Sequence, residues 1–400
     1  MKSSFPQDWK EYTIGDCLRR VEHPVEVDSD ALYTQIGICS HGKGLFYKEP
    51  VTGESLGNKA VYWVEPNCFI LNIVFAWEQA IGKTTQAEVG MIGSHRFPMY
   101  KPVNNLVDID YLVYYLLTKR GTDILEAASP GGAGRNRTLG QDRFMKSKIV
   151  LPPLDEQKKI AEILATQDKA IELQGRKIEE LKRFKKGCLE KMFPRKGQKV
   201  PEKRFPGFTD DWEQRKLGEL GTITTGSTPS TAIPDYYSDD GIVWVTPTDI
   251  CENITFESAR KLSDLGQQVG RVVPKNTILV TCIASIGKHT MLGSTGSFNQ
   301  QINGLTPNEN ECDPYFLLTE SALWSAKMKS SAAAGTMQIV NRTEFSELKT
   351  WLPSLIEQQA ISDFFRQLDY LITLHQRKLE EMKKQKKALM QLLLTGIVRV

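Results

Sequence analysis

The chain has 400 residues, 40% hydrophobic and 25% charged, and its 51 Lys and Arg against 48 Asp and Glu give a formal net charge of +3. This composition excludes a disordered chain, and the length suits two domains. The seven cysteines include no C-x-x-C pair, which predicts reduced thiols with no zinc site or disulfide framework. Because it has neither a signal-like start nor a run approaching roughly 18 apolar residues, we expect a cytoplasmic protein that does not cross a membrane.

Residues 1–150 show short apolar runs separated by Gly, Pro and Asn, a pattern that predicts strands of a mixed α/β domain. The expected strands lie within 31–38, 60–64 and 68–77. The segment "DYLVYYLLTKRG" (110–121) has the apolar content of a helix.

Residues 151–194 predict one long helix. A proline start precedes it, and apolar residues then recur at three- and four-residue spacing with no interior proline. About 40 helical residues would reach about 60 Å, which is longer than the diameter of a 150-residue domain. An ordinary amphipathic helix packed on its own domain remains the simpler alternative.

A polar linker (195–207) leads to a second mixed α/β domain at 208–351, with expected strands within 242–246 and 276–286 and a helix at 314–330. Residues 352–395 then repeat 151–194 at a fixed offset of 201, with 16 identities in 44 positions. A unit of about 200 residues is therefore duplicated.

The duplication includes more than the helices. "FPQDWKEYTIGD" (5–16) is echoed by "FTDDWEQRKLGE" (208–219), and "AIGKTT" (80–85) is paired with "SIGKHT" (285–290). We predict an α+β protein with two mixed α/β domains in tandem, each followed by a long helix. The two helices are expected to pair as an antiparallel coiled coil, because neither can bury its apolar stripe alone. The residues assigned to this packing and to partner contacts are Ile160, Leu164, Ile171, Ile178, Ile361, Phe365, Ile372 and Leu379.

Catalytic motifs are missing from the sequence. "AIGKTT" fails as a phosphate-binding loop because Trp77 stands where the first glycine belongs. The sequence contains no HExxH, no GxSxG and no His/Cys metal spacing, and Pro234-Asp235 is more than 100 residues from Glu347–Lys349, too far to suggest a nuclease motif. We therefore expect a non-catalytic chain.

Polar loops beside aromatic residues offer side chains that could bind DNA. Asn and Gln can pair with adenine edges, and Arg and Lys with guanine or phosphate. Turn formation or core hydrogen bonding is the alternative role for each of these residues. The candidates are Lys43, Lys83, His95, Arg96, Arg135 and Arg137 in the first domain and Thr225, Ser227, Thr228, Thr248, Lys288, Gln300, Gln301, Asn303, Gln338 and Asn341 in the second.

The whole chain resembles a specificity subunit of a type I restriction-modification system. The likeness is carried by "LPPLDEQKKIAEIL" (151–164) and "LPSLIEQQAISDFF" (352–365), with "GSTPS", "WVTPTDI", "SFNQQINGL" and "LLLTGIVRV". The first domain departs from the pattern, with "SHRFPMY" near the place of "NQQI".

The resemblance implies two target recognition domains that each read one half of a split double-stranded DNA site, and helices that set the spacing between the halves. It also implies two methyltransferase subunits that bring S-adenosylmethionine, and restriction motor-nuclease subunits that use ATP and Mg. This chain itself is expected to bind no cofactor.

Charge gives only weak support to DNA binding. Residues 1–154 balance at 17 basic against 17 acidic, and 205–351 carry 11 against 17, whereas 155–204 carry 15 against 9. Two rival functions therefore stay open. One is a coiled-coil scaffold that joins two ligand-binding domains without touching DNA, and the other is a self-contained restriction enzyme.

Overall fold

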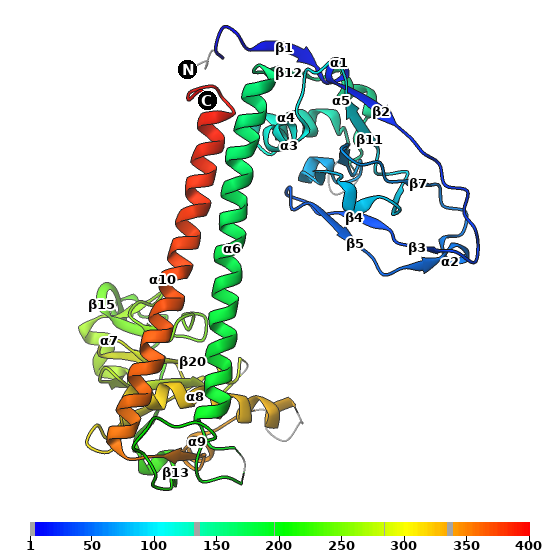
Figure 1. The fold of residues 1–400 in the computed structure, drawn as a ribbon. Helices are drawn as coiled ribbons and strands as arrows, with labels where there is room; N and C mark the ends of the chain where they lie inside the picture. The colour runs from blue at the N-terminus through cyan, green and yellow to red at the C-terminus, as the bar shows by residue number, and fades with distance from the viewer. Residues whose placement is uncertain (1–4, 132–136, 196, 284, 334–338) are drawn as a thin grey trace. The chain divides into compact units, whose positions relative to one another are not determined.

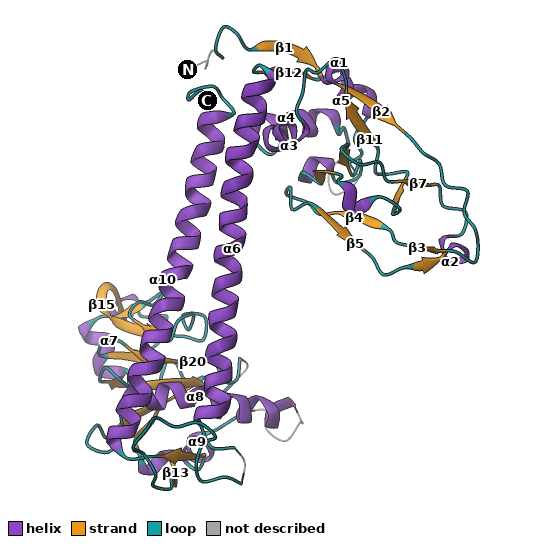
Figure 2. Ribbon diagram, in the orientation of Figure 1, coloured by secondary structure: helices purple, strands orange, loops and turns teal. Residues whose placement is uncertain are grey.

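The computed structural model describes residues 5–131, 137–195, 197–283, 285–333 and 339–400 (Figures 1 and 2). The chain forms two compact units. Unit 1 comprises Met1–Gly175 and Arg377–Val400, and unit 2 comprises Arg176–Gln376. The boundaries between the units fall inside the two long helices, so each unit holds a domain together with one half of each helix.

Unit 1 is built around an antiparallel sheet in the order β2-β11-β8-β9, accompanied by short two-stranded pairs. The expected helix at 110–121 is two helices, because Thr118 accepts a hydrogen bond from the Gly121 amide and so caps a second helix. The main sheet is formed by β2 (Leu18–Val21), β11 (Met99–Pro102), β8 (Phe69–Leu71) and β9 (Ile81–Lys83). The pairs are β1 (Lys10–Thr13) with β12 (Lys148–Leu151), β7 (Val61–Trp63) with β10 (Ile92–Ser94), β3 (Leu32–Tyr33) with β6 (Val51–Thr52), and β4 (Ile36–Ile38) with β5 (Leu45–Tyr47). The helices are α1 (Ile14–Cys17), α2 (Gly53–Leu56), α3 (Ile109–Leu116), α4 (Lys119–Ala128) and α5 (Gln141–Lys146), with 3-10 turns η1 (Ala76–Glu78) and η2 (Gln86–Glu88).

Unit 2 has a five-stranded sheet in the order β14-β22-β19-β20-β16 and a four-stranded sheet in the order β17-β15-β21-β18. The expected helix at 314–330 is confirmed as α8 (Pro314–Ala333). The strands are β14 (Gly221–Thr225), β22 (Ile302–Pro307), β19 (Ile278–Thr281), β20 (His289–Leu292), β16 (Ile254–Thr255), β17 (Lys261–Leu262), β15 (Tyr237–Val245), β21 (Gly296–Phe298) and β18 (Val272–Val273), and β13 (Glu213–Lys216) pairs with β23 (Lys349–Leu352). The other helices are α7 (Asp264–Val269) and α9 (Arg342–Ser346), with η3 (Leu217–Glu219) and η4 (Pro234–Tyr236).

The sheets of the two units share one plan. Strands β2, β11, β8 and β9 of unit 1 have the order and antiparallel pairing of β14, β22, β19 and β20 of unit 2. The pair β1-β12, which leads into the first long helix, corresponds to β13-β23, which leads into the second. The duplication predicted from sequence is therefore present in the strand topology.

The long helices are α6 (Leu154–Met192) and α10 (Leu355–Leu393). Within unit 1 the first half of α6 packs against the last turns of α10, and the Gln167 amide donates to the Met382 carbonyl at 3.3 Å. Within unit 2 the last turns of α6 pack against the first half of α10, and Phe184 contacts Phe364 edge to face. The two helices therefore run antiparallel in both units, as predicted.

Each helix is fixed to its own domain by the Glu-Gln pair that the sequence repeats. In unit 1 the Gln157 amide donates to the carbonyls of Leu106 and Pro152, both at 2.9 Å, and accepts from the Asp108 amide, the N-cap of α3. Gln157 is fully buried, and with its partners it satisfies backbone groups that would be costly to bury unpaired.

The same anchor recurs in unit 2. The Gln358 amide donates to the carbonyls of Glu311 and Pro353 at 3.1 and 2.9 Å and accepts from the Asp313 amide at 2.9 Å. The glutamine of "LPPLDEQ" and "LPSLIEQ" is therefore a joint between a long helix and the domain before it.

The glutamate of each pair binds an arginine that follows the other long helix. Glu156 accepts from Arg399 at 2.5 and 2.7 Å, and Glu357 accepts from Arg204 at 2.8 and 2.6 Å. These are two-pronged guanidinium–carboxylate pairs, which fix geometry as well as charge.

A Tyr-Asp-Lys contact occurs once in each unit at the same offset of 201. In unit 1 Asp168 accepts from the Tyr114 hydroxyl at 2.8 Å and pairs with Lys386 at 2.5 Å. In unit 2 the corresponding contacts of Asp369 are with Tyr315 at 2.9 Å and Lys185 at 2.6 Å. Each contact joins α6, α10 and one domain.

Candidate nucleic-acid interface

The polar loops of unit 2 gather at one edge of its sheets. Strand registers place Thr225 opposite Asn303 and Thr281 opposite Ile302, while β15 and β21 run parallel and end together at Val245 and Phe298. The loops at 226–230, 246–250 and 299–301, with the described residues 282–283 and 285–288, therefore leave the same edge. We call them the unit 2 edge loops.

The unit 2 edge loops are held to one another by hydrogen bonds. The Trp244 indole donates to the Ser227 carbonyl at 3.0 Å, and the Arg271 guanidinium donates to the Thr225 carbonyl at 2.7 Å. Lys288 donates to the Pro247 carbonyl at 2.9 Å, and the hydroxyl of Thr228 donates to the side-chain oxygen of Gln300. Sequence reasoning missed Trp244 and Arg271, which brace the loops. Of the predicted residues in these loops, Thr228, Thr248, Lys288 and Gln300 are exposed, and Ser227 and Gln301 are partly buried.

Three predicted contacts in unit 2 make hydrogen bonds within the domain. Asn303 is only 2% exposed, and its amide group bonds to Thr225, Cys282 and the Val340 carbonyl, so the prediction that it faces DNA is corrected. Thr225 is its partner and is partly buried. Asn341 caps α9, where its side-chain oxygen accepts from the Glu344 amide at 3.0 Å. Gln338 lies outside the described residues.

Unit 1 presents an edge built in the same way. His95 and Arg96 are exposed in the loop between β10 and β11, and the Arg96 carbonyl accepts from the Ile73 amide at 3.0 Å. The guanidinium of Arg137 lies 5.3 Å from the ring centroid of Trp77 in the β8–β9 loop. Sequence analysis missed Trp77 as a possible contact and used it only to reject a phosphate loop.

A third loop meets this edge of unit 1. The amides of His41 and Gly42 donate to the carbonyls of Glu78 and Gln79, which brings the loop containing the exposed Lys43 against the β8–β9 loop. The edge therefore combines Lys43, His95, Arg96 and Arg137. Arg135 lies outside the described residues.

Lys83 is not part of this edge. It ends β9 opposite Phe69, at the other end of the sheet, and its ammonium group pairs with Asp110 at 2.5 Å. The predicted phosphate contact is therefore corrected, because the charge is neutralised within the domain.

The proposed pairing of "AIGKTT" with "SIGKHT" is also wrong. The backbone amide of Asn72 donates to the Ala80 carbonyl, and in the same way the backbone amide of Thr281 donates to the Lys288 carbonyl. This makes Ala80, and not Lys83, the counterpart of Lys288. The shared letters occur at different positions because the two loops differ in length.

One turn has identical hydrogen bonding in the two edges. In unit 1 the Phe97 amide donates to the Ser94 carbonyl at 2.8 Å, and the Arg96 amide donates to the Ser94 side chain at 3.3 Å. In unit 2 the backbone amide of Ile302 donates to the backbone carbonyl of Asn299 at 3.1 Å, and the backbone amide of Gln301 donates to the side-chain oxygen of Asn299 at 3.1 Å. His95-Arg96 and Gln300-Gln301 therefore occupy equivalent positions.

The helix residues assigned to partner contacts are mostly in the protein's own cores. Ile160 and Leu164 are buried in the unit 1 core, and Ile361 and Phe365 in the unit 2 core. The other four, Ile171, Ile178, Ile372 and Leu379, are buried or partly buried. The six buried residues contribute to the packing of the protein itself, which corrects their assignment to partner contacts, whereas for the partly buried Ile171 and Leu379 that assignment stays a prediction. Larger apolar side chains exposed on α6 and α10 are Ile163, Leu173, Phe184, Ile356, Tyr370, Leu371, Leu374 and Leu392.

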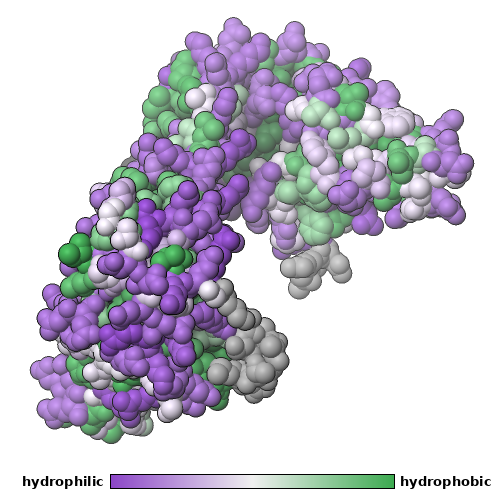
Figure 3. Space-filling model, turned by 60° about the horizontal axis from the view of Figure 1, so that its bottom comes forward, coloured by the Kyte–Doolittle hydropathy of each residue, from purple (hydrophilic) through white to green (hydrophobic). Residues whose placement is uncertain are grey.

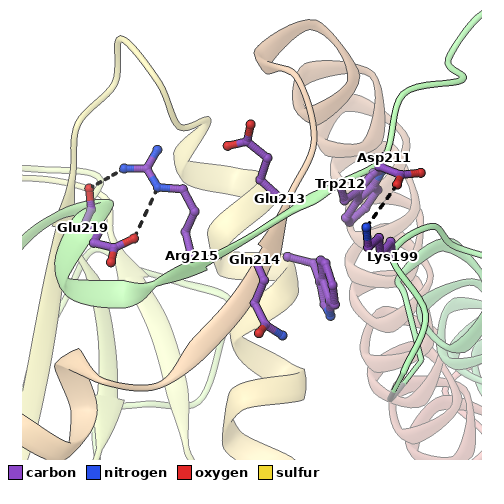
Figure 4. A pocket seen from close by; sticks show the side chains of 8 residues that line it. Lys199, Asp211, Trp212, Glu213, Gln214, Arg215 and Glu219 are labelled. Atoms are coloured by element: carbon purple, nitrogen blue, oxygen red, sulfur yellow. Dashed lines mark hydrogen bonds and ion pairs between the residues drawn. The ribbon is translucent and has the colours of Figure 1, made fainter.

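The face shown in Figure 3 is mostly hydrophilic with scattered apolar patches. An open depression in unit 2, about 620 Å³ in volume, is lined by Trp212, Trp351, Glu213 and Gln214 and by two ion pairs, Arg215 with Glu219 and Lys199 with Asp211 (Figure 4). It includes none of the predicted DNA contacts and lacks a cluster of convergent unpaired polar groups.

Within the described ranges, the structure has neither a reactive cysteine site at Cys68 or Cys282 nor a metal-binding site. Burial raises the pKa of Cys68 and Cys282 to about 11, which keeps these thiols protonated and weakly nucleophilic. Within the residues that the structure describes, no three His, Cys, Asp or Glu side chains are placed to hold a metal ion. None of the described helices combines the length and apolar character needed to span a bilayer.

Comparison with known proteins identifies the family. A model described as the type I restriction modification DNA specificity domain matches residues 6–183 and again 209–384. The chain belongs to this family. The family resemblance inferred from sequence is thereby confirmed, and the two matches coincide with the duplicated unit.

Relatives in the family match nearly the whole chain. It is 25% identical to the putative type I restriction enzyme MjaX specificity subunit of Methanocaldococcus jannaschii, over 99% of this chain and 95% of that protein. It is 22% identical to the HindI specificity subunit of Haemophilus influenzae, over 90% and 94% of the two chains.

Solved structures share the fold. The S subunit of the type I system from M. genitalium aligns with a TM-score of 0.61 at 13% identity over 98% of both chains. A chain from a structural study of assembly and conformational transition in the type I system aligns with a TM-score of 0.62 at 16% identity, over 99% of this chain and 100% of that one. At these identities the likeness supports the fold alone.

Proposed function

We propose that this protein reads a bipartite double-stranded DNA target and positions methyltransferase subunits on it. The observation that carries the proposal is the pair of edges. Each unit presents exposed polar side chains from loops on the same strand scaffold, but the side chains themselves differ. One chain therefore offers two distinct reading surfaces, joined by the continuous helices α6 and α10.

In this function the chain is non-catalytic and acts in the cytoplasm. The partner methyltransferase subunits bind S-adenosylmethionine and transfer the methyl group, and restriction motor-nuclease subunits use ATP and Mg. Partner subunits also supply much of the phosphate contact, since the unit 2 domain is acidic overall, with 11 basic against 17 acidic residues at 205–351.

The test is to express the full-length chain with the methyltransferase subunit of the same system and to sequence host DNA for methylated adenines. A split motif with a fixed gap supports the proposal. A stable complex that methylates no specific sequence would instead support the rival scaffold function, and methylation or cleavage by the chain alone would support the self-contained enzyme.

A further inference from the structure

The equivalent turns at 94–97 and 299–302 carry different chemistry on the same backbone. Unit 1 has His95 and Arg96 where unit 2 has Gln300 and Gln301. Since the backbone hydrogen bonds are shared, the exchange changes what the turn presents and leaves the turn itself unchanged.

A second position in the edges shows the same exchange. The Leu139 amide donates to the Ile73 carbonyl at 2.8 Å, and the Val340 amide donates to that of Cys282 at 3.0 Å, so Leu139 and Val340 occupy equivalent positions. Arg137 then corresponds in sequence to position 338, a glutamine, at the offset of 201. The unit 1 edge thus has guanidinium groups at two positions where the unit 2 sequence has amides.

The side chains have the polar groups needed to read bases. Arg96 is exposed, and the described residues include no hydrogen-bond or ion-pair partner for its guanidinium group. In unit 2 the Thr228 hydroxyl donates to the side-chain oxygen of Gln300, which orients the amide, while its nitrogen has no partner among the described residues. An oriented amide offers the donor and acceptor pair that adenine requires, and a guanidinium fork matches the two acceptors of guanine.

We infer that this dipeptide determines specificity in both units: Arg96, its second residue, reads a guanine in one half-site, and Gln300, its first residue, reads an adenine in the other. The inference rests on the proposed function and deepens it by naming the bases. Arg137, stacked on Trp77, adds a second cation to the edge that reads guanine.

The experiment exchanges the two dipeptides in the full-length chain, as H95Q/R96Q and as Q300H/Q301R. Each variant is expressed with the methyltransferase subunit, and methylated adenines are mapped. We expect H95Q/R96Q to lower methylation of the original motif about tenfold to a hundredfold and to change one base of one half-site from guanine to adenine. Q300H/Q301R should make the opposite change in the other half-site only.

Single variants separate base reading from phosphate binding. R96K keeps the charge and can still donate to guanine as a point charge, so the motif should keep its guanine, whereas Arg96→Gln should change that base. Lys83→Gln, at the opposite end of the sheet, is the matched control and should leave the motif unchanged. His95, Arg96 and Gln300 are exposed, whereas Gln301 and Lys83 are partly buried, so the thermal midpoint of each complex checks that it is folded.

The outcomes distinguish the inference from the function it rests on. If Arg96→Gln and both exchanges weaken methylation of every sequence equally with the motif unchanged, the residues contact phosphate and the inference is overturned while the split motif remains. If the unaltered complex has no split motif, the proposed function itself fails.

Discussion

The two units agree where a domain meets the long helices and differ where loops leave the sheets. Gln157 and Gln358 make the same three hydrogen bonds, whereas the equivalent turns carry His95-Arg96 in one unit and Gln300-Gln301 in the other. A duplicated chain that repeats its joints and varies its edges presents two chemically different loop surfaces, one in each unit. In each unit the joints to the long helices set the geometry, and the edge loops set the chemistry.

The largest expected effect comes from changing the length of one helix. Four residues inserted after Glu180 add about 6 Å and rotate the helix by about 40°. The contact of Gln167 with Met382 and that of Lys185 with Asp369 then cannot both keep their register. We expect the original motif to lose methylation, while each domain stays folded by circular dichroism.

A matching insertion of four residues after Leu374 in α10 is the control. It restores both contacts, so methylation should return on a motif with the same half-sites and a gap about one to two base pairs longer. Return of the original gap would argue against the helices as the spacer.

Removing the glutamate of each Glu–Arg pair should destabilise the two units by different amounts. In unit 2 the side chain of Glu357 is 2% exposed and that of its partner Arg204 is 13% exposed. In unit 1 the side chain of Glu156 is 6% exposed, but its partner Arg399 is 42% exposed and also pairs with Asp8. Glu357→Ala leaves a nearly buried guanidinium unpaired and should cost about 3–5 kcal/mol in unit 2. Glu156→Ala should cost less in unit 1. Hydrogen exchange of each unit measures both, and equal losses would contradict the role of burial.

Lowering the pH should change the stability of the two units in opposite directions. Burial raises the pKa of Glu320 in α8 to about 7, and its folded state therefore holds a proton more tightly than the unfolded chain. Its contribution to stability is full below about pH 4.5 and is lost as the pH rises through 7, in total about 3 kcal/mol. In unit 1 burial alone would raise the pKa of Glu88, but hydrogen bonds from Tyr47 and Thr85 outweigh burial and lower this pKa. The stability that Glu88 contributes is therefore lost as the pH falls.

We expect Glu320→Gln to remove the loss of unit 2 stability between pH 5 and 8 and to make unit 2 more stable at pH 8. The exposed Glu252→Gln is the control. Hydrogen exchange across this range reports on each unit, and a pH slope that survives in Glu320→Gln would show that another group causes it.

The smallest expected effect concerns the Tyr-Asp-Lys contacts. Tyr315→Phe removes one hydrogen bond to the well-covered Asp369 and should cost about 1–2 kcal/mol, and Tyr114→Phe should cost less because Asp168 is more exposed. Unfolding of the full chain in urea measures both. A larger loss for Tyr114→Phe would show that exposure does not set the difference.

Sequence reasoning predicted the parts of the fold that depend on periodic patterns. The helices at 151–194 and 352–395 are present as Leu154–Met192 and Leu355–Leu393, because a 40-residue apolar stripe has few alternative explanations. The short strands were less well placed. The run at 68–77 forms only a three-residue strand, since the chain turns at Asn72 and enters a 3-10 turn at Ala76.

The candidate site was harder to predict, because exposure depends on tertiary register. Asn303 and Gln300 belong to one polar run, yet one side chain is buried in the sheet and the other is exposed in the turn. Lys83 resembled Lys288 by its neighbours in sequence, but only strand pairing shows that they lie at different ends of equivalent strands. The correspondence of Arg137 with position 338, in contrast, was available from the offset of 201.

The most direct test exchanges residues 208–351 for the corresponding domain of another specificity subunit and maps methylated adenines with the same methyltransferase subunit. If each unit reads its own half-site, one half of the split motif changes, and the other half and the gap remain. If both halves change together, or neither does, the two units do not read DNA independently.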